Sequence, residues 1–255
     1  MKVAVFGAAG WAGRAVLANL AGRHEIRAID RGPAAWQEWE DIDGPWDGGQ
    51  VVHSDIVDFD AVHEALDGMD AVIHLTAFFP RGDHEAEDAD QTFLINVKGL
   101  WNVLESSHRH GIGRIVHMGS CQTEHPNGVF FSSEVRRPDA SLYAVSKRLQ
   151  EEMCRQMHEG RGMRIVVLRP NYIIDGRLGL GRFREKFAPG SKRASGGCVC
   201  RHDLAEACRL GIEADHVDFE ILHTVGTMRL DHVCNAARTR QVLGLEYAND
   251  LEAYE

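Results

Sequence analysis

The sequence predicts an α/β fold in which helices cover both faces of a doubly wound parallel sheet of about seven strands. Short runs rich in β-branched residues alternate with longer helical patterns along the chain, and this order is typical of parallel sheets. The 255 residues, with 44% hydrophobic content, suffice to bury a core in one domain, residues 1–255. No linker, internal repeat or low-complexity tract divides the sequence.

Each strand is predicted from a short apolar run, and each long helix from apolar residues at helical spacing. Long helices are expected over 88–110 and 141–158. Their apolar stripes would either cover the sheet or form the seam of a homodimer. Stretches rich in Gly, Pro and Asp at 31–49 and 125–139 are expected to be surface loops. The expected strands are Lys2–Phe6, Glu25–Ile29, Gln50–His53, Ala71–Leu75, Arg114–Met118, Arg164–Leu168 and Phe219–His223.

Composition argues against several classes of protein. A formal net charge of −10 would repel nucleic acid and anionic membranes. The chain has no apolar run of 18 residues, and its first strand begins at Lys2, so we expect neither a membrane span nor a leader and place the protein in the cytoplasm. The 6 cysteines lack the spacing of a disulfide framework. Cys198 and Cys200 are a weak candidate metal pair, and we expect no metal site.

A glycine-rich turn, Gly7-Ala8-Ala9-Gly10-Trp11-Ala12-Gly13, lies between the first expected strand and a helix. Backbone N–H groups at such a turn can bind phosphate oxygens, which predicts a Rossmann-type dinucleotide site. Asp30 ends the next strand, where a carboxylate would accept hydrogen bonds from the adenosine ribose and repel a 2′-phosphate. This favours NAD, although the adjacent Arg31 could tolerate NADP. Asp55 would meet the adenine amino group or serve as an ordinary loop residue.

Tyr143 and Lys147 are four residues apart in the second long helix. Residues at this spacing share a helix face, and a cation beside a phenol lowers the pKa of the hydroxyl. Such a tyrosine can accept a proton from an alcohol while a nicotinamide accepts the hydride. The pair therefore predicts an oxidoreductase.

These motifs, in their order along nearly the whole chain, resemble the extended short-chain dehydrogenases/reductases, the NAD-dependent epimerase/dehydratase group. The resemblance implies that Tyr143 is the catalytic base or acid and that Lys147 both tunes it and binds ribose. Ser120 would hydrogen-bond the reacting oxygen, with Thr123 as the alternative. The matching segments are GAAGWAG at 7–13, Asp30, HSDIVD at 53–58, HLTA at 74–77, NVKGLWNVLE at 96–105, GSCQT at 119–123, YAVSK at 143–147 and LRP at 168–170.

The resemblance also extends the expected cofactor site beyond the glycine turn. Asn96 would belong to the helix that braces the lysine, or it would have a structural role in helix bending. The residues expected to contact the cofactor are Gly7, Gly10, Trp11, Ala12, Gly13, Asp30, Asp55, Ile56, Leu75, Thr76, Ala77, Asn96, Tyr143, Lys147 and Pro170.

Within the group, the chain is most similar to the compact uronate dehydrogenases, which oxidise a hexuronic acid at its anomeric carbon to the lactone. Nucleotide-sugar epimerases and dehydratases usually carry a larger C-terminal substrate lobe, whereas this sequence ends soon after the motif VLGLEY at 242–247. Here Ser120-Cys121-Gln122 replaces the usual Ser-Asn-His run. That departure leaves the identity of the sugar open.

A basic segment between Gly176 and Arg201 contains 7 Arg or Lys residues and the single acid Glu185. It falls in a predicted substrate-loop insertion, residues 171–202. An arginine there would grip an anion through two hydrogen bonds, or the segment would be a solvated or subunit-contacting face. Phe78 and Phe79 would form a floor for a sugar ring or pack in the core. The residues expected to bind substrate are Phe78, Cys121, Gln122, Thr123, Asn171, Arg177 and Arg182.

Together these features predict an NAD-dependent dehydrogenase of an anionic, uronate-like sugar, acting as a homodimer through the helices at 88–110 and 141–158. An epimerase or dehydratase that oxidises and re-reduces one sugar is the alternative within enzymes. A catalytically silent NAD-sensing protein is the alternative outside them, and the complete set of Ser120, Tyr143 and Lys147 argues against it.

Overall fold

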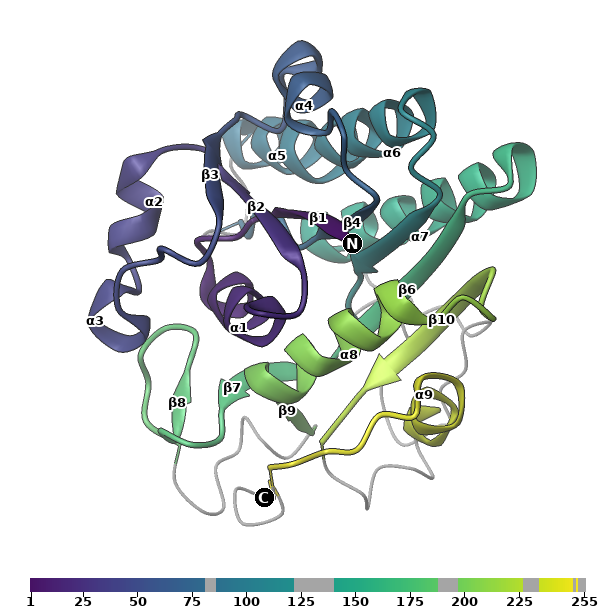
Figure 1. The fold of residues 1–255 in the computed structure, drawn as a ribbon. Coiled ribbons are helices and arrows are strands. Elements are labelled where there is room, and N and C mark those ends of the chain that lie inside the picture. Colours follow the sequence, from purple (N-terminus) through teal and green to yellow (C-terminus); the bar gives the residue numbers. More distant parts are fainter. Residues whose placement is uncertain (81–85, 122–139, 188–196, 227–233, 250, 252–255) are drawn as a thin grey trace.

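Seven parallel strands form the main sheet of the computed structural model, in the order β10-β6-β5-β4-β1-β2-β3 (Figure 1). The structure describes residues 1–80, 86–121, 140–187, 197–226, 234–249 and 251. This arrangement confirms the predicted doubly wound α/β fold. The strands are β1 (Lys2–Phe6), β2 (Glu25–Asp30), β3 (Gln50–His53), β4 (Ala71–His74), β5 (Arg114–Met118), β6 (Arg164–Pro170) and β10 (Phe219–Thr224).

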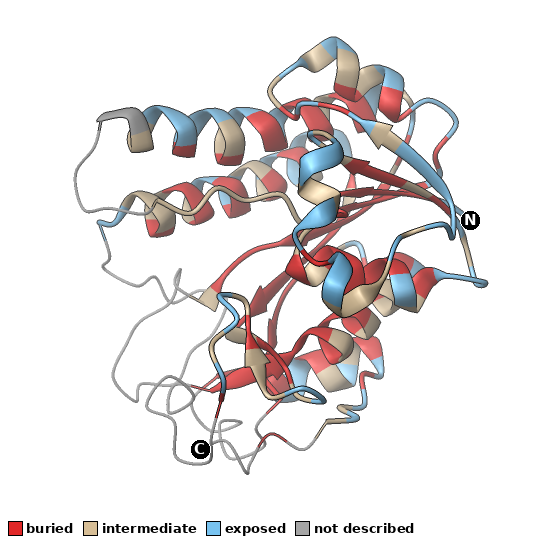
Figure 2. Cartoon of the chain, turned by 90° about the vertical axis from the view of Figure 1, so that its left-hand side faces the viewer, coloured by how far each residue is buried: buried red, intermediate tan, exposed pale blue. Residues whose placement is uncertain are grey.

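Helices cover both faces of this sheet, and its central strands are buried between them, whereas the edge strand β3 is largely exposed (Figure 2). One apolar core joins the sheet to α1 and α8, and a second joins it to α4, α6 and α7. Because both faces are covered, the central strands read as continuous apolar runs. The helices of these layers are α1 (Trp11–Leu20), α4 (Phe59–Ala65), α6 (Gly99–Arg109), α7 (Leu142–Arg161), α8 (Arg201–Glu213) and α9 (Ala236–Leu243), which packs on β10.

The long helix expected over 88–110 is interrupted. It consists of α5 (Ala86–Thr92), a π-helical turn η1 (Phe93–Lys98) and then α6. A π-turn adds a residue to the helical repeat and often occurs at functional sites. Here it contains Asn96, one of the expected site residues.

The segment 31–49, expected to be a surface loop, contains two short helices, α2 (Pro33–Gln37) and α3 (Glu40–Asp43). Trp39 between them is only 3% exposed. The loop expectation was therefore wrong for the middle of this segment. Helices of four or five residues are too short to show a periodic pattern, and tertiary contacts hold them in place.

A second, small sheet lies in the predicted substrate-loop insertion. It has the order β8-β7-β9, from β7 (Tyr172–Asp175), β8 (Leu180–Gly181) and β9 (Cys198–Cys200). The hairpin of β7 and β8 approaches α3 (Figure 1). None of the helices described is long and apolar enough to cross a membrane. The described residues also contain no group of three or more His, Cys, Asp or Glu side chains arranged to hold a metal ion.

Candidate active site

The glycine turn lies where the strand order of the main sheet reverses, between β1 and β4. Ligands of open α/β sheets bind at the carboxyl ends of the strands at such a point. Gly7 has a φ of 77°, and a Cβ there would lie 2.9 Å from the backbone N of Thr76. A Cβ on Gly13 would lie 2.2 Å from the carbonyl oxygen of Gly7. Only glycines fit these two positions, so the turn is closely packed. The N–H groups of Gly7 and Ala8 already donate to Ile29 O at 3.0 and 3.2 Å, so a phosphate would be held by the first N–H groups of α1.

Asp30 lies beside this turn, as expected of a ribose-binding carboxylate. Its Oδ2 accepts a hydrogen bond from Ala9 N at 3.0 Å, and its Oδ1 accepts one from Arg31 N at 2.9 Å. Asp55 is exposed and accepts from Val57 N at 3.1 Å. Helix α1 begins after Gly10 with no side-chain cap and no acid in its first turn. These features fit the diphosphate and ribose of a dinucleotide.

Two other residues expected to contact the cofactor, Trp11 and Ile56, are largely buried in packing contacts. Trp11 is 7% exposed, and its ring packs at a tilt against that of Trp39, with the centroids 4.6 Å apart. Its indole N–H donates to the carbonyl oxygen of Ile173. Trp11 therefore joins α1 to α3 and β7. Ile56 is 6% exposed and belongs to the second core. The half-buried residues after β4 are Leu75, Thr76 and Ala77, and Pro170 ends β6.

Ser120, Tyr143 and Lys147 come together at the carboxyl end of β5. Tyr143 hydrogen-bonds Ser120. The Lys147 ammonium lies 5.7 Å from the centroid of the Tyr143 ring and donates to the carbonyl oxygen of Met118 at 2.8 Å. Lys147 is only 1% exposed. The predicted trio thus occupies one site, with the lysine at its base.

Burial opposes ionisation of both groups of the pair. It raises the pKa of the Tyr143 hydroxyl above its ordinary value, while the hydrogen bond with Ser120 and the charge of Arg182 lower it. Burial also lowers the pKa of Lys147 to about 7. The pKa of Tyr143 is therefore raised overall in this structure, and the neighbours that act against the increase are Ser120 and Arg182.

Asn96 ties the loop after β4 to helix α7. Its Oδ1 accepts from Phe78 N at 2.7 Å, and its Nδ2 donates to Phe78 O at 3.1 Å and to Ser146 Oγ at 3.0 Å. Ser146 directly precedes Lys147. Asn96 also lies in the π-turn η1, so the bracing and the bending roles considered from the sequence occur together.

Phe79 and Arg182 continue the site outward from the tyrosine. The rings of Phe79 and Tyr143 stack with centroids 4.7 Å apart. The Arg182 guanidinium carbon lies 3.6 Å from the centroid of Phe79 and 4.7 Å from that of Phe183. In the part of the chain described, Arg182 forms no hydrogen bond or ion pair. Among the described residues, no carboxylate is in ion-pair contact with this cation near the phenol, although the charges of Glu185 and Glu38 act on it.

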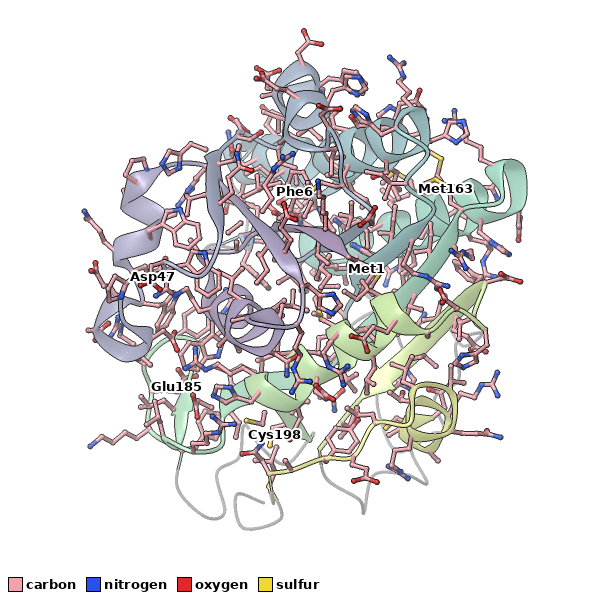
Figure 3. All side chains as sticks on the ribbon, in the orientation of Figure 1. Met1, Phe6, Asp47, Met163, Glu185 and Cys198 are labelled. Carbon is pink, nitrogen blue, oxygen red and sulfur yellow. The ribbon has the colours of Figure 1, made fainter. Side chains whose placement is uncertain are left out.

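Other described arginines of the basic segment differ from Arg182. Arg184 pairs with Asp41 at 2.7 Å, and Arg201 is buried between Asp43 and Asp175 at 2.7 and 2.8 Å. These two arginines join the hairpin and α8 to α3 and β7. Arg177 is exposed. Glu185, the acid of the segment, lies in the hairpin (Figure 3) and accepts from the Tyr172 hydroxyl.

The remaining expected substrate residues are only partly placed. Phe78 is held by Asn96, Asn171 donates its N–H to Thr224 O at 3.3 Å, and Cys121 is half-buried near Tyr143. Gln122 and Thr123 lie outside the described residues. The sequence analysis missed Trp39 and Asp41, which contact the substrate hairpin through Arg184. A large apolar side chain such as Trp39 in the segment 31–49, which was expected to be a surface loop, could have indicated that part of this segment is buried.

Comparisons with known proteins agree with this geometry. Residues 3–176 match the model of the "NAD dependent epimerase/dehydratase family". The chain is 27% identical to an NAD-dependent glucose-6-phosphate dehydrogenase of Haloferax volcanii, over 96% of this chain and 92% of that one. It is 30% identical to a uronate dehydrogenase of Pseudomonas putida, over 66% and 59%.

A solved structure, the uronate dehydrogenase of Agrobacterium tumefaciens, superposes with a TM-score of 0.79 at 21% identity, covering 99% of this chain and 86% of that one. At this identity the likeness establishes the fold. The family match covers more than half of the chain, and the glycine turn with Asp30 fits the NAD that the family description names. The chain is therefore an NAD-dependent enzyme, and it belongs to the NAD dependent epimerase/dehydratase family.

Proposed function

We propose that the protein is an NAD-dependent dehydrogenase that oxidises a hydroxyl of an anionic sugar, such as a uronate. The observation that carries this proposal is the position of Arg182, whose guanidinium stacks on Phe79, which in turn stacks on Tyr143. A guanidinium with no carboxylate bound to it can receive a carboxylate or phosphate through two parallel hydrogen bonds. The names of the two relatives, a uronate and a sugar-phosphate dehydrogenase, support an anionic substrate.

In the proposed reaction, the sugar hydroxyl is hydrogen-bonded by Ser120 and loses its proton to the Tyr143 oxygen. Bound NAD supplies the hydride acceptor. Lys147 at the base of the site stabilises the phenolate and binds ribose, while Asp30 and the glycine turn hold the adenosine ribose and diphosphate. Phe79 provides an apolar surface for the sugar, and the order imposed by these contacts accounts for much of the rate.

The substrate class is tested by replacing the proposed anion grip. Arg182→Met replaces the guanidinium over Phe79 by an uncharged, apolar side chain. KM for a uronate should therefore rise by roughly 10-fold or more, while KM for a neutral aldose changes little. Absorbance at 340 nm reports NADH formation. Arg177→Met, at an exposed position of the same hairpin, is the matched control. Equal effects of Arg182→Met on charged and neutral sugars would contradict the charge grip.

The second candidate is an epimerase or dehydratase, which returns the hydride to the same sugar. The description of the matching family, which names epimerases and dehydratases, supports it. The two candidates differ in the absorbance test. A sugar product formed with no steady rise at 340 nm would support the epimerase or dehydratase.

We also propose that the protein forms a homodimer through η1, α6 and α7. Large apolar side chains are exposed on these helices, with exposed fractions of 38% for Phe93, 43% for Leu94, 44% for Trp101 and 42% for Leu149. Phe93, Leu94 and Trp101 line a groove together with Val97 and Met153. A contiguous apolar surface of this kind is uncommon on a monomer and typical of a subunit interface.

A further inference from the structure

Lys147 lies in a pocket whose other ionisable groups are mostly uncharged. His74 from β4 and His117 from β5 interact with it across the sheet, and their rings hydrogen-bond each other through Nδ1 at 3.1 Å. Burial lowers the pKa of His74 to about 3 and that of His117 well below its ordinary value, so both imidazoles are neutral at pH 7. Burial raises the pKa of the Cys154 thiol on α7, which keeps it protonated.

Glu151 is the carboxylate that faces Lys147. It follows Lys147 by four residues on α7 and therefore lies on the same face of the helix. Burial lowers the pKa of Lys147 to about 7, and the charge of Glu151 acts against this decrease. With a pKa near 7, Lys147 is close to half protonated at neutral pH, so the carboxylate has a large effect on its charge.

Arg169 on β6 holds Glu151 in place. Its Nε donates to Glu151 Oε1 at 2.7 Å and its Nη2 to Oε2 at 2.6 Å, so the pair is bidentate. Glu151 is 7% and Arg169 is 3% exposed. A Cβ on Gly119 would lie 3.1 Å from Glu151 Oε1, which places the carboxylate against the backbone just before Ser120. The pair is thus packed between α7, β6 and the turn after β5.

We propose that Glu151, oriented by Arg169, is a positioning residue that keeps Lys147 protonated at the base of the active site. The effect on turnover rests on the proposed function, because it requires that the Lys147 ammonium stabilise a Tyr143 phenolate. The protonation of Lys147 itself is a property of the chain and can be measured without substrate. An ion pair that only stabilised the fold would leave the titration of Lys147 unchanged.

The first measurement is an NMR titration of the cofactor-free protein labelled with [13C]lysine. The chain contains only 5 lysines, and the signal of Lys147 is assigned by its loss in Lys147→Met. In the wild type, the Lys147 signal should titrate near neutral pH, so its pKa should be far below the pKa values of the other four lysines. Glu151→Gln should lower its pKa by about one unit or more, because the carboxylate that favours the charged form is lost.

Two further variants complete this measurement. Glu151→Gln/Arg169→Met removes both charges, so no buried ion is left unpaired if the single variant folds poorly. The pKa of Lys147 should fall in this variant too, by less than in Glu151→Gln. Glu152→Gln, at the next and exposed position of α7, is the matched control and should leave the titration unchanged. A Lys147 pKa that stays at its wild-type value in both Glu151 variants would overturn the proposal.

The second measurement is the pH dependence of kcat/KM with the best substrate. In Glu151→Gln the loss of activity on the alkaline side should begin at lower pH than in the wild type, by the shift found by NMR. If no sugar is oxidised, the NMR result still decides the role of Glu151, so the two proposals fail separately. A shifted titration with an unchanged pH profile would show that the Lys147 charge is not used in turnover and would overturn its functional part.

Discussion

At the scale of single residues, the site contains ionisable groups whose uncharged forms are favoured by burial. Burial favours the neutral phenol of Tyr143 and the neutral amine of Lys147, and a few neighbours act against it. Ser120 and Arg182 favour the phenolate, and Glu151 favours the ammonium. The charge distribution needed for proton transfer therefore depends on residues from three parts of the chain: the turn after β5, helix α7 and the substrate hairpin. This makes the pH dependence of the enzyme a sensitive report on each of them.

Tyr143→Phe removes the proton acceptor and should lower turnover by roughly 10²–10⁴-fold. NAD affinity should change little, because the glycine turn and Asp30 are intact, and the phenyl ring still stacks on Phe79. Turnover is followed at 340 nm and NAD binding by calorimetry. Tyr247→Phe, which removes another buried phenol far along the chain, is the control and should retain near wild-type turnover. Near-normal rates in Tyr143→Phe would remove the phenol from the mechanism.

Lys147→Met should stabilise the fold in a pH-dependent way. The pKa of Lys147 falls from 10.5 in the unfolded chain to about 7 in the folded one, so between these values the unfolded state binds more protons and stability rises with pH. The cost of burying the amine is greatest below pH 7. The variant should therefore unfold at a temperature higher than the wild type by about 3–8 °C at pH 6.5, with the difference shrinking toward pH 10. A pH-independent difference in calorimetric melting temperature would contradict the assigned pKa.

At the scale of elements, the strands were predictable and the short connections were not. Apolar runs located every strand of the main sheet within about two residues. For the central strands the reason is that a strand buried on both faces must be apolar throughout. The helices α2 and α3 could not be predicted in this way, since Asp43 is held by Arg201 from α8, more than a hundred and fifty residues away. The stack of Phe79 between Tyr143 and Arg182 likewise depends on a hairpin brought from another part of the chain.

The glycine turn leaves the least room for an added side chain, because a Cβ on Gly13 would clash with backbone atoms. In Gly13→Ala, the new Cβ would meet the carbonyl oxygens of Gly7 at 2.2 Å and Ala8 at 2.6 Å, and backbone cannot move aside as a flexible side chain can. We expect the unfolding free energy to fall by about 2–4 kcal/mol and NAD binding to be lost or greatly weakened. Gly160→Ala in α7, where a Cβ meets nothing within 4 Å, is the control and should be neutral or stabilising. Denaturant unfolding and calorimetry measure both effects, and similar results for the two variants would contradict this account.

At the scale of the whole molecule, the catalytic residues and the exposed apolar helices are separate features of one chain. Tyr143 and Lys147 point toward the sheet and the hairpin, whereas Leu149 on the same helix α7 is exposed. One helix can therefore serve the site with one face and an interface with another. Because Ser120, Tyr143, Lys147 and Arg182 all come from a single chain, the chemistry does not require the partner to supply any of them.

Trp101→Glu tests whether these helices form the dimer seam. A charge placed in the centre of a closed apolar interface is left without a partner and costs several kcal/mol, which should convert a dimer of 28.4 kDa chains to monomers at micromolar concentration. Light scattering after size exclusion gives the mass. Leu178→Glu, at a position 53% exposed in the substrate hairpin, introduces the same charge elsewhere and should leave the mass unchanged. The proposed interface would be contradicted if the wild-type protein were already monomeric or if the mass of Trp101→Glu were unchanged. A monomeric variant that still forms NADH would show that each chain carries a complete site.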